Sequence, residues 1–141
     1  MTASLRTPAP TRFSWSATVS AYGMVLLGPL AAWLLWVSWS DGYASDASNV
    51  AWFASVATAV VAAGALAPAG WAHRVALSAL GVVSTIATLV WWWSAEDESG
   101  LFMVGVLLAT PLVAAAAPAL LGLGALLRRH LGRRTRRDVR W

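Results

Sequence analysis

Residues 75–95 read VALSALGVVSTIATLVWWWSA, a run of 21 residues without Asp, Glu, Lys or Arg. An α-helix rises about 1.5 Å per residue, so about 20 apolar residues are needed to cross a hydrocarbon core of about 30 Å. This run is therefore long enough to span a membrane. Three further charge-free runs, at 13–40, 47–73 and 99–127, contain 28, 27 and 29 residues.

The composition of the whole chain agrees with membrane insertion. Of its 141 residues, 59% are hydrophobic and 11% are charged, which argues against a disordered chain and an ordinary soluble domain. In lipid the backbone must satisfy its own hydrogen bonds, and the runs lack the alternating pattern of an outer-membrane barrel. We predict an all-α polytopic membrane protein, an antiparallel bundle of four transmembrane helices at about residues 18–39, 50–67, 71–93 and 100–127.

The remaining segments are too short to form a second domain. Residues 1–17 are predicted to be a flexible leader and residues 128–141 a basic tail. The first run follows two arginines, as in a secretory signal, but its length and its tryptophans favour a retained anchor. Because the connections between the predicted helices are short, we expect helices adjacent in sequence to pack as antiparallel neighbours.

The charges predict the orientation of the chain. All ten basic residues are arginines, in segments 1–12 and 128–140 and at Arg74, and the predicted topology puts these three places on one side. Five of the six acids lie in the two other connections. Short basic segments stay on the cytoplasmic side, so both termini are predicted to be cytoplasmic. The use of Arg without Lys and the many alanines indicate a bacterial gene, hence the inner (plasma) membrane.

Two patterns predict contacts of the helices. Small residues recur every four positions in the second span and predict a flat helix-packing face of Ala51, Ser55, Ala59, Ala63 and Ala67. Aromatic side chains gather near the outer ends of the first three spans, where indoles favour the membrane interface, and predict an outer aromatic belt of Trp36, Trp39, Trp52, Trp91, Trp92 and Trp93. Pro111 and Pro118 in the last span predict a kink or break near Ala114.

The sequence offers little chemistry. It has no cysteine, and its two histidines lie among arginines at the inner surface, so we expect no catalytic residue, no metal site and no cofactor. Glu96, Asp97 and Glu98 resemble a cation site, but an EF-hand spacing is absent and a solvated loop is the favoured interpretation. Trp91, Trp92 and Trp93 resemble an aromatic box for a cationic headgroup. Successive helical positions are about 100° apart, so membrane anchoring by splayed rings is favoured. The alternative is that one of these rings meets Trp36 or Trp52 in an outer pocket.

The C-terminal tail is the strongest charge feature. Its seven arginines predict contact with anionic lipid headgroups or with an acidic partner at the membrane surface; they are Arg128, Arg129, Arg133, Arg134, Arg136, Arg137 and Arg140. Nucleic-acid binding would use the same charges, but no aromatic platform or reading module accompanies them, and it is not expected.

These features favour a non-catalytic function. The chain has strong membrane signals, a helix-packing face and no carboxylate, Lys or His within the predicted hydrocarbon layer. We expect a small accessory or structural subunit of a larger membrane complex, which contacts lipid and other membrane subunits or copies of itself. The alternative is a homo-oligomeric channel or carrier for a neutral or apolar solute, lined by the second and fourth spans.

Overall fold

The computed structural model describes residues 15–40, 44–97 and 99–138. They form four α-helices, α1 (Trp15–Trp36), α2 (Asp46–Leu66), α3 (Trp71–Glu96) and α4 (Phe102–Asp138). Each of the four is long and apolar enough to cross a membrane, judged by length and composition. The prediction of an all-α chain with four apolar helices of membrane-spanning length is confirmed.

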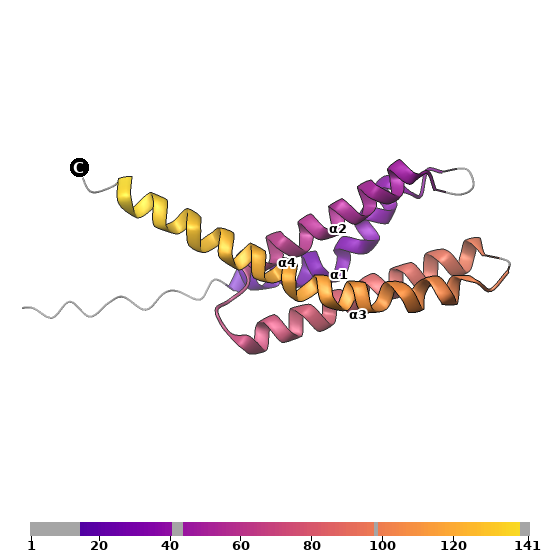
Figure 1. Ribbon diagram of the computed structural model, residues 1–141. Helices are drawn as coiled ribbons and strands as arrows, with labels where there is room; N and C mark the ends of the chain where they lie inside the picture. Colours follow the sequence, from indigo (N-terminus) through magenta and orange to yellow (C-terminus); the bar gives the residue numbers. More distant parts are fainter. Residues whose placement is uncertain (1–14, 41–43, 98, 139–141) are drawn as a thin grey trace, which may run out of the picture.

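The connections between the helices lie at two opposite ends of the molecule. Residues 37–40 and 44–45, between α1 and α2, lie at the same end of the molecule as residues 99–101, between α3 and α4 (Figure 1). We call this the acidic end. Residues 67–70 connect α2 to α3 at the opposite end, which we call the basic end, close to the start of α1 (Figure 1).

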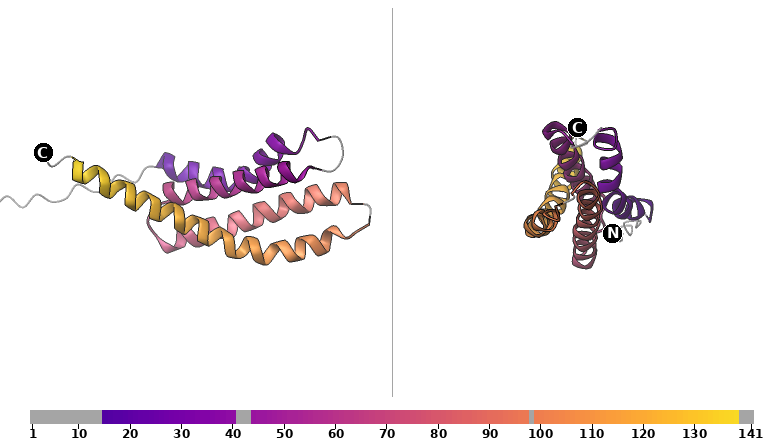
Figure 2. Two further views of the ribbon diagram at one scale, coloured as in Figure 1. Left: turned by 45° about the horizontal axis from the view of Figure 1, so that its top comes forward. Right: turned by 90° about the vertical axis from the view of Figure 1, so that its right-hand side faces the viewer.

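The order of the helices around the molecule differs from their order in the chain. Helix α1 packs against α2 and α3, and α4 also packs against α2 and α3 (Figure 2). Between α2 and α3 the described residues make no extensive contact. The expectation that helices adjacent in sequence pack as neighbours is therefore wrong for this pair. The five Cα steps from Leu66 to Trp71 reach about 17 Å, and neighbouring helix axes are only about 8–10 Å apart, so the connection allows a diagonal arrangement.

The helix boundaries follow local capping. Helices α1 and α3 agree with the predicted spans to within three residues, whereas α2 begins at Asp46, four residues before the predicted start. Ser45 is its N-cap, and its Oγ accepts a hydrogen bond of 3.1 Å from the backbone N–H of Ser48. A capping serine followed by an acid in the first turn stabilises a helix start, so the helix begins among polar residues ahead of the apolar run.

Helix α4 is longer than predicted. It continues from the apolar run through the first part of the basic tail to Asp138, since Arg and Leu are good helix formers. It is also continuous through Pro111 and Pro118, so of the predicted kink or break no break occurs. Figure 1 and the left view of Figure 2 show the axis of α4 changing direction near its middle.

The buried side chains form one cluster toward each end. The cluster toward the basic end contains Ala21, Val25, Val60, Ala63, Ala67, Leu77 and Leu121. The cluster toward the acidic end contains Ala32, Val37, Trp52, Val56, Leu89 and Trp92.

A proline within α1 is accommodated by a side chain from α3. Pro29 has no N–H, so the carbonyl oxygen of Val25, four residues earlier, lacks its helical donor. The Oγ of Ser84 donates a hydrogen bond of 2.8 Å to this oxygen. The contact is close because Gly81 lies beside it, where an added Cβ would be 3.2 Å from Val25 Cγ1. Hydroxyl side chains commonly satisfy carbonyls that proline leaves unpaired in transmembrane helices.

Helices α2 and α4 approach each other through two glycines. A Cβ added to Gly64 would lie 2.8 Å from the Cα of Leu121, and one added to Gly124 would lie 2.8 Å from the backbone nitrogen of Ala65. At both positions the obstacle is backbone, which cannot move away without separating the helices. The backbones of α2 and α4 are therefore in direct contact, as is typical of helix packing in membranes.

Candidate functional site

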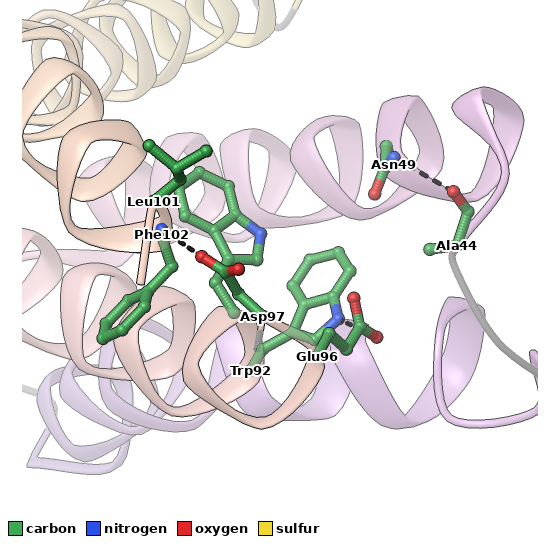
Figure 3. A pocket seen from close by; sticks show the side chains of 8 residues that line it. Ala44, Asn49, Trp92, Glu96, Asp97, Leu101 and Phe102 are labelled. Carbon is green, nitrogen blue, oxygen red and sulfur yellow. Dashed lines mark hydrogen bonds between the residues drawn. The ribbon is translucent and has the colours of Figure 1, made fainter. Parts of the chain in front are cut away.

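The acidic end contains a pocket of about 320 Å³. It is bordered by residues around the start of α2, at the end of α3 and at the start of α4 (Figure 3). The lining residues are Ala44, Asn49, Trp92, Trp93, Glu96, Asp97, Leu101 and Phe102.

Helical spacing places an indole and a carboxylate of α3 together. Trp92 and Glu96 are four residues apart, so they share a face of the helix, and Trp92 Nε1 donates a hydrogen bond of 2.7 Å to Glu96 Oε1. Trp92 is 4% exposed. Its ring meets that of Trp52 edge to face, with centroids 5.9 Å apart. The position of the Glu96 carboxylate is thus tied to a buried aromatic pair.

Trp93 forms the wall on the α4 side. An added Cβ at Gly105 would lie 3.0 Å from Trp93 Cζ3, so the glycine provides the space for this ring. Leu101, directly before α4, and Phe102, its first residue, also line the pocket. Figure 3 shows the Asp97 carboxylate lying between them and the end of α3.

Asp97 joins α3 to α4. Its Oδ1 accepts a hydrogen bond of 2.7 Å from the backbone N–H of Ser99 and another from Ser99 Oγ. Its Oδ2 accepts from the backbone N–H of Phe102, at the start of α4. The hydrogen bond from the Ser99 hydroxyl, followed by those from backbone amides, lowers the pKa of Asp97 from its ordinary value of 3.8. Asp97 is therefore an anion at neutral pH.

The pocket combines negative charge with aromatic walls. The donors to Glu96 and Asp97 are an indole N–H, a hydroxyl and backbone amides, all of which are neutral. No Lys or Arg occurs in residues 75–127. Indole and phenyl faces attract cations, most strongly where water is displaced. The chemistry that this arrangement offers is recognition of a positive charge.

The predicted outer aromatic belt divides into two groups. Trp39 is 81% exposed, and Trp36 and Trp91 are about half exposed, so these three are available to a surrounding interface. Trp52 is fully buried and Trp92 nearly so. The rings of these two residues pack inside the protein.

The other belt residues also make specific contacts. Trp36 Nε1 donates a hydrogen bond of 3.0 Å to Ser55 Oγ, and the ring of Trp91 packs edge to face on Trp33. Trp93 is partly buried beside Gly105. The three consecutive tryptophans of α3 thus have different surroundings, as their angular spacing predicts.

The small residues predicted as a packing face do not meet one single neighbour. Ala59 lies against Gly28 of α1, where an added Cβ would be 3.3 Å from Ala59 Cβ. Ala63 and Ala67 are buried in the cluster toward the basic end, whereas Ala51 and Ser55 are half-buried. The rows of an α-helix at i, i+4 rotate gradually around its axis, which explains this spread.

Sequence reasoning missed the closest approach in the fold. Gly64 and Gly124 bring α2 against α4, yet neither belongs to the repeat of small residues in the second span. The available signal was the type of residue. Gly64 is the single glycine in residues 47–69, and a glycine inside an apolar helix is typical of a place where two backbones approach closely.

Part of the basic tail contacts the protein itself. Arg128 Nη1 donates hydrogen bonds of 3.3 and 3.0 Å to the carbonyl oxygens of Ala65 and Ala67, at the end of α2. Arg129 is exposed. The backbone at positions 133, 134, 136 and 137 is helical, while the side chains of Arg133, Arg134, Arg136 and Arg137, and all of Arg140, lie outside the described part.

The remaining polar residues that the sequence suggests as candidates form no metal site in the described part of the chain. His73 Nδ1 lies 3.1 Å from the hydroxyl of Tyr22, which joins α3 to α1 at the basic end. Glu98 lies outside the described residues. Across residues 15–40, 44–97 and 99–138, no group of three or more His, Asp and Glu side chains is arranged to hold a metal ion.

Comparison with models of protein families, with curated proteins and with solved structures finds no match for this chain.

Proposed function

We propose that this chain is a multi-pass protein of a bacterial inner membrane. Its four helices form an antiparallel transmembrane bundle with both termini in the cytoplasm. Two features support this arrangement: the four helices are of membrane-spanning length, and all arginines fall in the leader, at the basic end and in the tail. The acidic end then faces away from the cytoplasm.

Within that membrane, we propose a non-catalytic function as an accessory or structural subunit of a larger complex. The observation that carries this proposal is the free face of α4. Only 17% of its most apolar stretch is buried, against 28% in α1 and α2 and 33% in α3. Its exposed residues include Leu108 and Leu112, one turn apart, and the small pair Ala115 and Ala119.

This face has the composition of a helix–helix contact. Lipid chains are as apolar as leucine, so helices associate in membranes where small residues let two backbones approach. The same device already joins α2 to α4 through Gly64 and Gly124. Ala115 and Ala119 offer a second such surface on the side of α4 that the other three helices leave uncovered.

Purification of the tagged chain from its native membrane in mild detergent tests the function. We expect a membrane protein to be recovered in constant ratio to it. The double variant Ala115→Leu/Ala119→Leu should lose this partner. Ala72→Leu/Ala76→Leu, a pair of exposed alanines with the same spacing on α3, should retain it. Recovery of the chain alone at every detergent strength would contradict the proposal.

The same experiment identifies the alternative function. If the only partner is a further copy of the chain, the purified protein is placed in liposomes and tested for flux of neutral solutes. Solute flux that Ala115→Leu/Ala119→Leu abolishes would replace the accessory function by a homo-oligomeric channel or carrier.

Cysteine labelling tests the orientation. The natural chain has no cysteine, so a single introduced thiol reports one position. In intact cells a membrane-impermeant thiol reagent should label Ser40→Cys and Ala95→Cys from outside, and label Ala69→Cys and Thr135→Cys only after lysis. Labelling of Ser40→Cys and Ala95→Cys from opposite sides would contradict the bundle.

A further inference from the structure

We propose that the pocket at the acidic end binds a small organic ammonium cation. The residues that line it include the acids Glu96 and Asp97 and the aromatic residues Trp92, Trp93 and Phe102; all of these except Trp93 are labelled in Figure 3. This inference concerns a ligand of the single chain and does not depend on the proposed complex.

The charge of the pocket is not neutralised within its walls. Trp92 Nε1 donates to Glu96, and Ser99 and the Phe102 amide donate to Asp97. These donors are neutral, so they orient the two carboxylates and leave their negative charge available. A cation in the pocket is attracted by both negative charges and contacts the aromatic side chains that line it.

The walls favour an organic cation over a metal ion. A hard divalent cation takes six to eight oxygen ligands, and the described part of the chain holds no group of three metal-ligating side chains. An alkylammonium ion instead carries its charge inside a shell of methyl or methylene groups. That shell gains from contact with indole and phenyl faces, as in known ammonium recognition by aromatic side chains, and Trp93, Phe102 and Leu101 provide those surfaces.

The size of the pocket limits the ligand. A volume of about 320 Å³ lies near the lower end of the roughly 300–1,000 Å³ found for ligand sites. It fits a single small headgroup such as choline or tetramethylammonium. A larger amphiphile would have to leave its chain outside.

The position of the pocket predicts a structural effect of binding. Its walls come from the start of α2, the end of α3 and the start of α4. A ligand that contacts all three holds the acidic end together. A ligand that binds only the folded state also raises thermal stability as its concentration rises above its dissociation constant.

Isothermal titration of the purified full-length chain in an uncharged detergent tests the proposal. Choline is titrated at constant ionic strength and compared with 3,3-dimethyl-1-butanol, its neutral isostere. We expect saturable choline binding, binding of the isostere at least tenfold weaker, and a rise in melting temperature with choline alone. Equal binding of the two compounds, or no binding of choline, would overturn the proposal.

Two charge variants separate a site from general attraction. Glu96→Gln keeps an acceptor for Trp92 Nε1 but removes the charge, and should weaken choline binding at least tenfold. Asp46→Asn removes an exposed charge at the same end that does not line the pocket, and should leave binding within about twofold. Equal loss in both variants would show surface electrostatics and would contradict a built site.

Aromatic and ionic controls complete the test. Phe102→Leu should weaken choline binding, whereas Phe102→Tyr should retain it, because only the latter keeps an aromatic face. Replacement of sodium by calcium at equal ionic strength should not displace choline. Displacement by calcium, or choline binding that Phe102→Leu leaves unchanged, would identify an inorganic cation site instead.

Discussion

The hydroxyl of Ser84 donates a hydrogen bond of 2.8 Å to the carbonyl oxygen of Val25, the acceptor that Pro29 leaves without its helical donor. The contact joins the middle of α3 to the middle of α1, and both residues are buried. In a lipid environment no water is present to satisfy such a carbonyl. A polar side chain in one helix thereby compensates for a proline in another.

Removing this hydroxyl should destabilise the fold only while the proline is present. Ser84→Ala is expected to lower the free energy of unfolding by about 0.6 kcal/mol, and by no more than about 1.7 kcal/mol, the range for such bonds in membranes. In a Pro29→Ala background residue 29 regains its N–H, so the cost of Ser84→Ala should shrink. Unfolding in mixed detergent micelles measures this double-mutant cycle. An equal cost in both backgrounds would contradict the compensation.

The close approach of α2 and α4 should be sensitive to a single methyl group. Gly124→Ala places a Cβ 2.8 Å from the backbone nitrogen of Ala65, and such overpacking costs about 1–3 kcal/mol. Gly122 is the matched control, because nothing lies within 4 Å of an added Cβ there. Gly122→Ala should leave stability unchanged or raise it through helix propensity. Equal effects of the two variants on thermal unfolding would contradict the contact.

The turn between α3 and α4 should weaken in acid. The pKa of Asp97 is lowered from 3.8 in the folded chain, mainly by the Ser99 hydroxyl. The charged form is therefore stabilised by folding, and this contribution is fully present above the higher pKa of the unfolded chain. It is lost as the pH falls through the lower, folded pKa. Asp97→Asn should reduce the fall in melting temperature on acidification from pH 6, and an unchanged pH profile would argue against this cap.

Two neighbouring arginines should behave differently. Arg128 binds the carbonyl oxygens of Ala65 and Ala67, whereas Arg129 is exposed. Positive charge at a helix C-terminus contributes about 0.3–1 kcal/mol. Arg128→Ala should therefore speed amide hydrogen exchange in residues 63–70, and Arg129→Ala should not. Faster exchange in both variants, or in neither, would contradict a specific cap.

The sequence predicted each element but not the partner of each face. Trp52 and Trp92 illustrate this limit. Their positions near the ends of apolar runs indicated an interfacial belt, yet both rings are buried and in edge-to-face contact. Helical periodicity shows which residues share a face. It does not show whether another helix or the surroundings cover that face.

The pocket was visible in the sequence only in parts. The sequence contains three consecutive tryptophans followed by acids, but the angular spacing of the tryptophans argues against a shared box. In the structure, Trp92 and Trp93 line the pocket but Trp91 does not. Asn49 of α2 and Phe102 of α4 line it as well. Those additions depend on contacts between segments that are distant in the chain.

The sequence by itself determined the class of fold, because four runs without charge are each long enough to be a membrane-spanning helix. Only the tertiary structure decided that α2 and α3 make no extensive contact, that Gly64 and Gly124 join α2 to α4, and that Ser84 donates to Val25. The physical reason is the range of the forces involved. Helix formation and hydropathy act along the chain, whereas close packing and interhelical hydrogen bonds act between surfaces whose pairing a short connection leaves open.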